Sequence, residues 1–289
     1  MSTDEQSKYL QPVDDGLPMR DSQDYAKEKK LAVLEYYLTQ TIISMRDKWS
    51  VINFLDLQAG PGKNIIKNEI VLGSPLISLR LPHPFKHYYF NELNEENFLA
   101  LSTRIQASPF ASQVSLYQRD LNEVVFEICD KIESHDKQAK RSNQWSSLNV
   151  AFLDPEGLEL HWATVERLAK INKMDLIINF STMGLHRESG KNPESNRITA
   201  FFGNENWQQL AQTGDTIKRR RAFIDLYLSQ LKKLGYHIDE RDLESPDIAV
   251  RNSKNAEVYS LIFASKNPLG DKFWRNAKKK INPPRLPGF

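Results

Sequence analysis

The sequence has one cysteine, Cys129, in 289 residues, and its histidines follow no metal-binding pattern. A lone cysteine excludes a disulfide within the chain and a site built on several thiolates. His83 and His87 are four residues apart, but Pro84 between them prevents a shared helical face. We therefore expect no metal site.

Long apolar runs and a strong excess of one charge are also missing. No run reaches the roughly 18 apolar residues that span a bilayer, and residues 1–24 are polar, without the apolar core of a signal peptide. We therefore expect a cytoplasmic protein with no membrane contact. The formal net charge of +2 permits nucleic-acid binding without arguing for it, because a dedicated binder concentrates its basic residues on one face.

Short apolar runs alternate with helical patterns along the chain. The runs are rich in Val, Ile, Phe and Tyr, and they occupy residues 51–57, 87–93, 114–120, 148–154 and 174–180. This alternation predicts an α/β fold whose mostly parallel sheet is covered by helices on both faces. Two further runs, 236–243 and 257–265, leave no room for a crossover helix. They should pair antiparallel and complete a seven-stranded sheet.

A single domain is expected over residues 25–275, with tails at both ends. Residues 1–24 are polar without periodicity, which predicts a flexible tail, and residues 276–289 form a basic, proline-rich tail. Residues 184–215 are rich in Gly and Asn and are typical of an insertion after the fifth strand. Ligands of open α/β sheets bind at this edge.

The stretch NFLDLQAGPGKN, residues 53–64, ends an apolar run in Asp56 and continues as a glycine-rich loop. Ligands bind beyond the carboxyl ends of parallel strands. Gly60 and Gly62 lack the β-carbons that would keep a ligand away from the backbone. The spacing matches neither the dinucleotide fingerprint nor a P-loop. A tight turn without a ligand is the alternative.

Acidic residues follow the next strands as well. Glu92 follows the second strand, where a carboxylate can accept hydrogen bonds from ribose hydroxyls. Asp120 follows the third strand, where it can accept from an adenine amino group, and Asp154 follows the fourth. Each acid alone is typical of a helix cap, but acids at four successive strand ends favour a nucleoside-binding edge.

These features resemble class I methyltransferases, in which S-adenosylmethionine lies over the glycine loop. More narrowly, the segments KLAVLEYYL, DLQAGPG, GSPLISL, LDPEG and LIINF together resemble the three-Cys-motif partner proteins, a methyltransferase-like family named for its association with cysteine-motif proteins. The resemblance covers roughly residues 25–275. It implies a Rossmann-like class I methyltransferase fold, S-adenosylmethionine as cofactor and a cysteine-motif protein as a candidate partner, and it leaves the substrate open.

The resemblance also implies roles for particular residues. Asp56 would hold the amino end of the methionine part of the cofactor, Glu92 its ribose and Asp120 its adenine. Lys30 matches a lysine of the family, and an approach to the ligand and a solvated helix start are the alternatives for it. The implied cofactor contacts are Asp56, Ala59, Gly60, Pro61, Gly62, Glu92, Leu93, Asp120 and Leu121.

The turn Asp154-Pro155-Glu156-Gly157 is the candidate acceptor site. Methyltransferases that act on exocyclic base amines carry Asn/Asp-Pro-Pro and an aromatic residue, whose ring stacks on a flipped base. Asp154 and Pro155 are therefore candidate catalytic residues, and Glu156 and Gly157 candidate substrate contacts. Glu156 replaces the second proline, and Leu158 offers no ring, which argues against base flipping and leaves amine activation open. A capping turn is the alternative.

Basic residues supply candidate phosphate contacts. Arg187 follows the fifth strand, and basic runs occupy residues 218–221 and 278–280, although such runs are usually solvated helix ends. Phosphate contacts anchor a polynucleotide without reading its sequence. The sequence thus predicts S-adenosylmethionine-dependent methyl transfer to an amine of RNA or DNA. The alternatives are a methyltransferase-shaped partner subunit without turnover and a small-molecule methyltransferase.

Overall fold

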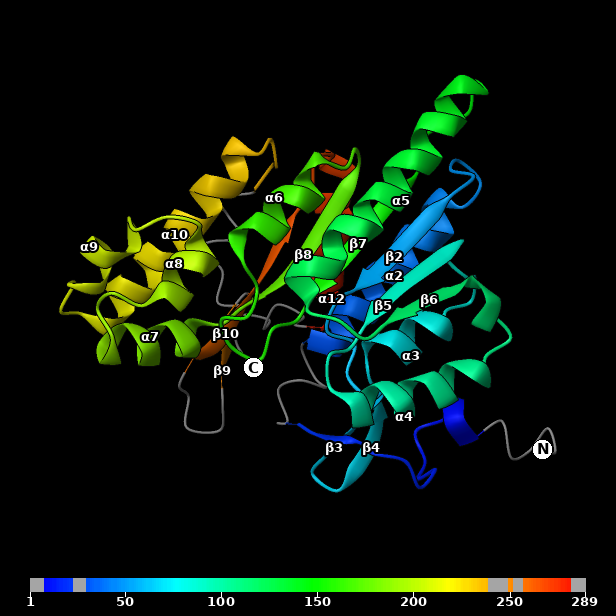
Figure 1. Cartoon of the computed structure of the whole chain (residues 1–289), viewed down its shortest axis with the longest axis horizontal. Coiled ribbons are helices and arrows are strands. Elements are labelled where there is room, and N and C mark those ends of the chain that lie inside the picture. Colours follow the sequence, from blue (N-terminus) through cyan, green and yellow to red (C-terminus); the bar gives the residue numbers. More distant parts are fainter. Residues whose placement is uncertain (1–7, 23–29, 239–248, 252–256, 282–289) are drawn as a thin grey trace, which may run out of the picture.

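The computed structural model describes residues 8–22, 30–238, 249–251 and 257–281. The strands of the main sheet are β2 (Ile52–Asp56), β5 (His87–Asn91), β6 (Val114–Tyr117), β7 (Leu148–Leu153), β8 (Met174–Phe180), β9 (Ala249–Arg251) and β10 (Glu257–Ala264). Their order in this 7-stranded sheet is β6-β5-β2-β7-β8-β10-β9 (Figure 1). All neighbours are parallel except β10, which is antiparallel to β8 and β9. The predicted α/β class and mostly parallel sheet are confirmed.

The strand before the last lies elsewhere than the sequence predicted. It is β9, whereas the expected strand was residues 236–243. In that segment His237 forms an isolated antiparallel bridge with Ser265, and residues 239–243 lie outside the described part of the chain. Tyr236 and Ile238 are buried on either side of His237, which is exposed. Residues 236–238 thus show the alternation of a strand and one antiparallel bridge but no ladder, and the rest of the predicted strand lies outside the described residues.

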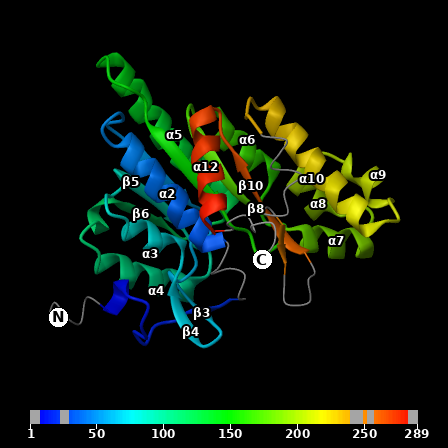
Figure 2. The ribbon, with the colours of Figure 1, turned by 180° about the vertical axis from the view of Figure 1, so that it is seen from behind.

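Helices cover both faces of the sheet, as the two opposite views show (Figure 1, Figure 2). One core contains Phe54 of β2 and the helices α2 (Ala32–Met45), α3 (Ser74–Leu79), α4 (Glu95–Gln106) and α12 (Pro268–Ile281). The other contains the next residue, Leu55, and the helices α5 (Leu121–Arg141), α6 (Trp162–Lys170), α8 (Asn196–Phe202) and α10 (Thr216–Lys233). Successive side chains of a strand point to opposite faces, so a sheet buried on both sides needs nearly continuous apolar strands.

The segment expected as an insertion and part of the expected C-terminal tail are helical. Residues 184–215 contain most of α7 (Thr182–Lys191), all of α8 and α9 (Trp207–Ala211), and Phe202 and Trp207 there are buried. The last helix, α12, runs through residues 276–281, where a tail was expected, and Lys278 is buried in it. Within the described ranges no helix has the length and apolarity to cross a membrane.

A hairpin that the sequence analysis did not predict follows the glycine loop. Its strands β3 (Lys63–Ile66) and β4 (Glu69–Leu72) pair antiparallel, and Lys67 and Asn68 between them have φ values of 50° and 64°. Two successive positive φ values are typical of a type I′ hairpin turn. The strand β1 (Arg20–Asp21) pairs parallel with β3 and completes a 3-stranded sheet. The glycine loop therefore leads into a second sheet, not directly into a helix.

A buried cluster of charges fixes residues 8–22, which we call the N-terminal arm. Asp15 accepts hydrogen bonds from Nη2 and Nε of Arg104 at 2.7 and 2.9 Å and pairs with Nζ of Lys63 at 2.7 Å. All three side chains are fully buried. Burial alone would raise the pKa of Asp15, but the bonds from Arg104 and Lys63 lower it to about 2. The arm thus belongs to the domain, in contrast to the flexible tail expected for residues 1–24.

Arg104 also connects the N-terminal arm to the glycine loop. Its Nη1 donates to the carbonyl of Pro18 in the arm at 2.9 Å and to that of Pro61 in the loop at 2.6 Å. Lys63 donates to the carbonyls of Lys8 and Val13, both at 2.8 Å. One buried guanidinium therefore holds the arm and the loop in a fixed relation.

We expect Asp15→Ala to lower the free energy of unfolding by about 3–5 kcal/mol, because Lys63 and Arg104 would stay buried without their counter-charge. Asp14→Ala is the matched control. Asp14 is exposed, and its carboxylate accepts from the backbone N of Gly16 at 2.8 Å. The loss of that one bond should cost about 1 kcal/mol or less. Urea unfolding measures both variants, and equal losses would contradict the role assigned to the cluster.

Candidate functional site

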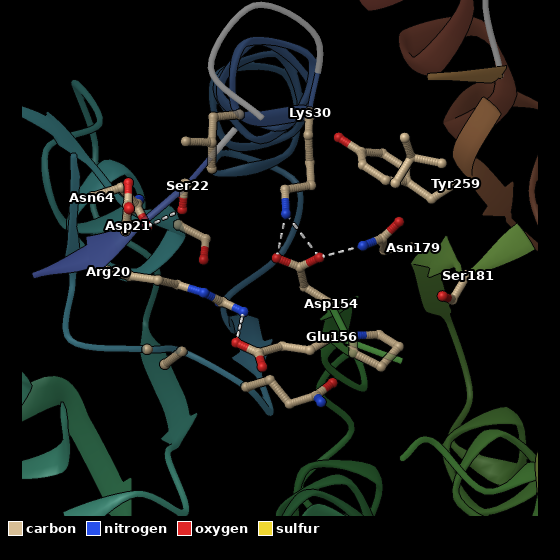
Figure 3. A pocket seen from close by; sticks show the side chains of 18 of the residues that line it. Arg20, Asp21, Ser22, Lys30, Asn64, Asp154, Glu156, Asn179, Ser181 and Tyr259 are labelled. Atoms are coloured by element: carbon tan, nitrogen blue, oxygen red, sulfur yellow. Dashed lines mark hydrogen bonds and ion pairs between the residues drawn. The ribbon is translucent and has the colours of Figure 1, made fainter. Parts of the chain in front are cut away.

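A cavity of about 400 Å³ lies at the carboxyl edge of the main sheet. Segments that are far apart in the sequence form its walls: the end of the N-terminal arm, the glycine loop after β2, the turn after β7, the end of β8 with the start of α7, and β10 (Figure 3). The structure thus brings the glycine loop and the turn around Asp154 to one site, at the edge where open α/β sheets bind their ligands.

The glycine loop presents its backbone to the cavity, which Ala59, Gly60, Pro61 and Gly62 all line. Gly60 has a φ of 63°, a left-handed conformation that side chains disfavour. A β-carbon placed there would meet only Nη1 of Arg20, at 3.9 Å, so the loop is open on this side.

Gly62 serves a different purpose from the one expected. Its φ is 92°, and a β-carbon there would lie 3.1 Å from Leu101 and 3.2 Å from Leu76, which belong to the core. The missing side chain at this position makes room for apolar packing. The expectation that both glycines clear space for a ligand therefore suits Gly60 alone.

Asp56, the last residue of β2, lies fully buried behind the glycine loop. Its Oδ1 accepts from the backbone N of Gln58 at 3.4 Å, and its Oδ2 has no hydrogen-bond partner among the described residues. Burial raises the pKa of Asp56 to about 7; the charges of Asp154 and Glu92 add to the rise, while Ser74 opposes it. Asp56 is not among the residues that line the cavity, so its carboxyl group can influence a cationic ligand group there only from behind the glycine loop.

Asp154 is held by two donors from different parts of the chain (Figure 3). Nζ of Lys30 lies 2.9 Å from Oδ1 and 2.6 Å from Oδ2, and Nδ2 of Asn179 donates to Oδ1 at 2.7 Å. The ammonium of Lys30 also lies 5.7 Å from the centre of the Tyr259 ring. These donors orient the carboxylate, and Oδ2 keeps the capacity for a further bond. Oδ1 of Asn179 is buried without a partner among the described residues.

An ion pair joins the N-terminal arm to the turn after β7. Nη2 of Arg20 contacts Oε1 of Glu156, and the two side chains are 29% and 73% exposed. Pro155 lines the cavity between Asp154 and Glu156, and Arg187 lines it from α7, where Nη2 lies 2.9 Å from Sδ of Met183. Of the four residues in the Asp-Pro-Glu-Gly turn, the first three therefore reach the cavity.

The two acids expected at the nucleoside bind backbone N–H groups in the structure. Glu92 accepts from the backbone N of Gly60 at 2.8 Å and from that of Asn94 at 2.9 Å. Asp120 caps α5 by accepting from the backbone N of Asn122 at 2.7 Å. Neither acid is among the residues that line the cavity. Glu92 shapes the glycine loop, whereas Asp120 has the capping role that any single strand-end acid is expected to have.

Other expected contacts also lie away from the cavity. Leu93 is 62% exposed, whereas Leu121 is buried in the core. The backbone N of Gly157 donates to Oε2 of Glu159 at 2.7 Å, which closes a local turn. Among the described residues no group of three or more His, Cys, Asp and Glu side chains is arranged to hold a metal.

None of the basic residues at 218–221 lines the cavity, and two of them make contacts within the fold. Arg219 donates to the carbonyls of Ala211 and Thr213 at 3.3 and 3.2 Å. Arg221 pairs with Asp225, one turn along α10, at 2.9 Å. Of the basic residues expected at phosphates, Arg187 is thus the one that the structure places at the site.

Among the site residues that sequence reasoning missed are Asn179 and Arg20. Asn179 lies one residue before the end of an apolar strand, and the signal that singled out the acids, a polar residue at a strand end, could have found it. Arg20 carries no such signal, because it lies in a polar segment that lacks periodicity. Its place depends on the contact of the arm with Arg104, which no local pattern reveals.

No family model matches the chain, and no significant match is found among curated proteins. Among solved structures, a Legionella pneumophila protein of the DUF519 family is 10% identical with a TM-score of 0.50, over 88% of this chain and 92% of that chain. A candidate O-methyltransferase from Klebsiella pneumoniae is 9% identical with a TM-score of 0.40, over 91% of this chain and 86% of that chain. Likeness at such low identity concerns the fold alone.

The strand order, with one antiparallel strand beside an otherwise parallel set, and the helices on both faces define an α/β protein with a mostly parallel sheet and a cavity at its carboxyl edge. This is the α/β class that the sequence predicted. Membership of the three-Cys-motif partner family stays a prediction, because no family model matches the chain.

The raised pKa of Asp56 predicts a pH-dependent stability. The pKa is about 7 in the folded chain and roughly 3.9 in an unfolded one. Between these values the folded state binds more protons, so the free energy of unfolding falls as pH rises from about 4 to about 7. Asp56→Asn removes this loss, so its free energy of unfolding at pH 8 should exceed that of wild type by about 1–3 kcal/mol. Urea unfolding from pH 4 to 8 tests this, and a difference that does not change with pH would contradict it.

Proposed function

We propose that this chain is an S-adenosylmethionine-dependent methyltransferase that acts on an amine of a nucleic acid. One observation carries the proposal: the glycine loop after β2, Asp154 after β7 and Asn179 at the end of β8 meet around one cavity. Each comes from the carboxyl end of a different strand. Such a site suits a ligand that is bound by backbone at one end and by charged side chains at the other.

The open side of Gly60 at the cavity allows the amino-acid half of S-adenosylmethionine to approach the backbone closely. Asp56 is fully buried and does not line the cavity, so in this proposal the charge of its orphaned Oδ2 attracts the ammonium group from behind the loop. Glu92 can still accept a bond from a ribose hydroxyl, since its two oxygens each accept one backbone N–H and have further lone pairs. When bound, this cofactor supplies a methyl group on a positively charged sulfur.

In this proposal Asp154 binds the acceptor. Its Oδ2 accepts a hydrogen bond from the amine, directs the nitrogen lone pair and stabilises the positive charge that develops on nitrogen. Lys30 and Asn179 are positioning residues that fix the carboxylate. Because Lys30 is itself a cation, its pairing weakens the electrostatic effect of Asp154, and its contribution lies in orientation.

A nucleic acid as acceptor is supported by Arg187, an exposed cation at the cavity from which a phosphate can be reached. RNA and DNA fit this chemistry equally. Leu158 is buried and offers no ring for stacking, so the acceptor amine has to be presented without the aromatic contact that flipped bases receive.

A second function is favoured by the contacts of Asp154 and Glu156. Both oxygens of Asp154 are bonded to Lys30, and Glu156 pairs with Arg20. A site that is internally satisfied in this way suits a binding subunit that keeps the cofactor pocket without turnover. The partner would then be a cysteine-motif protein, as the resemblance implies.

Cofactor binding tests the part that both functions share. Calorimetry with S-adenosylhomocysteine and S-adenosylmethionine should show saturable binding by the purified chain, with a loss of affinity as pH falls below about 7. The loss is expected because protonated Asp56 no longer attracts the ammonium group. Absence of binding to either compound at millimolar concentration would overturn the proposed cofactor.

The role of Asp154 predicts a large effect on turnover. Asp154→Asn should keep the fold and most cofactor affinity but lose on the order of a hundredfold in methyl transfer, the scale of one preorganised electrostatic contact. Asp130→Asn is the matched control, since Asp130 is an acid on α5 whose carboxylate pairs with Arg167. Transfer of a radiolabelled methyl group to cellular RNA and DNA measures both. Equal rates in Asp154→Asn and wild type would make Asp154 a structural residue, and cofactor binding without any labelled product would favour the binding subunit.

A further inference from the structure

Arg20 is presented to the cavity by a fixed strand. Its position in β1 pairs in register with Asn64 of β3, and the backbone N of Ser22 donates to the carbonyl of Ile65 at 2.9 Å. The arm before it is anchored by the buried pair of Asp15 with Arg104. The guanidinium of Arg20 is therefore held near the glycine loop by the fold itself.

The guanidinium lies between the glycine loop and the turn after β7 (Figure 3). Nη1 is 3.9 Å from the point that a β-carbon of Gly60 would occupy, and Nη2 contacts a carboxylate oxygen of Glu156. A guanidinium carries five N–H donors and matches a carboxylate with two parallel bonds. The site beside Gly60 is thus already complementary to a carboxylate, and Glu156 supplies one.

The pair of Arg20 with Glu156 is easily exchanged. Glu156 is 73% exposed, and an ion pair of this kind contributes little because water competes for both partners. Its role differs from that of the Arg104 pair, which is fully buried. A ligand carboxylate that enters the cavity can therefore replace Glu156 at small cost.

Groups of opposite charge lie on the two sides of the glycine loop. Asp56, at the end of β2, is buried outside the cavity lining with an orphaned oxygen, and Arg20 lines the cavity at the open side of Gly60. An amino acid carries an ammonium and a carboxylate on one carbon, so it can use both groups at once. An acid alone or an amine alone would use one of them.

We infer that Arg20 binds the α-carboxylate in the amino-acid half of the cofactor, and that Glu156 occupies this place when the ligand is absent. The inference rests on the proposed function, because it assigns a contact to the same cofactor. This contact would make Arg20 a determinant of specificity, because a nucleoside that lacks the amino-acid half cannot form it and would bind no more tightly in its presence. Glu156 acts as an internal competitor of the ligand.

Two ligands and three variants test the inference by calorimetry. S-adenosylhomocysteine carries the carboxylate, whereas 5′-methylthioadenosine keeps the nucleoside and the sulfur but lacks the amino-acid half. Arg20→Ala should lower the affinity for S-adenosylhomocysteine by about tenfold or more, because a charge-assisted hydrogen bond is lost. The affinity for 5′-methylthioadenosine should change by less than about twofold. Glu156→Gln keeps Arg20 and should raise the affinity for S-adenosylhomocysteine by about two- to fivefold, because the carboxylate that competes for Arg20 is gone. Arg80→Ala, the loss of an exposed cation after α3, is the control and should change neither affinity.

The outcomes separate this inference from the proposed function. If wild type binds neither ligand, the cofactor assignment fails and the inference fails with it. If wild type binds S-adenosylhomocysteine and Arg20→Ala binds it equally well, the inference alone is overturned. If Arg20→Ala binds neither ligand, Arg20 has a structural role, and the Glu156→Gln variant then tests the inference. An unchanged affinity of Glu156→Gln for S-adenosylhomocysteine would overturn the inference.

Discussion

The parallel pairing of β2, β7 and β8 is the constraint on which the site depends. Asp56 pairs with Phe152, and Leu153 pairs with Ile178, so Asp154 and Asn179 each lie one residue beyond a pair. This register makes their side chains neighbours and allows the bond of 2.7 Å between them. A shift of one residue in either strand would turn these side chains to opposite faces.

Parallel strands also collect negative charge at one edge, and the chain balances it from outside the sheet. Lys30, just before α2, pairs with Asp154, while Arg20 of the N-terminal arm pairs with Glu156. Glu92 is satisfied by backbone N–H groups. Asp56 receives no counter-charge from the described residues, and burial then raises its pKa. In the proposed function, this uncompensated acid behind the glycine loop would favour a cationic ligand group at the cavity.

The strands that the sequence predicted correctly are those whose own residues form a continuous apolar run. β8 is buried at every position, and a continuous apolar run is what a strand covered on both faces requires. β9 has three residues, and the turn at Lys67 and Asn68 adopts positive φ without glycine, so neither gives a local signal. The N-terminal arm looked like a tail because its order depends on Asp15 meeting Arg104, 89 residues away. The acids were correctly assigned to strand ends, but whether an acid caps a helix, as Asp120 does, or faces a cavity depends on packing that a pattern does not contain.

Two arginines act on the glycine loop, and their burial separates their roles. Arg104 is fully buried and donates to Pro61 and to Asp15, so its removal would leave buried partners unsatisfied at a cost of several kcal/mol. Arg20 is partly exposed and bonded to a carboxylate that water reaches, so its partner can change without disturbing the fold. The arm can therefore stay docked while its last residues exchange one carboxylate for another. The same strand carries both the fixed backbone and the exchangeable guanidinium, so binding at the loop needs no rearrangement of the domain. The affinity that Arg20 contributes is therefore not reduced by the entropy cost of ordering the chain.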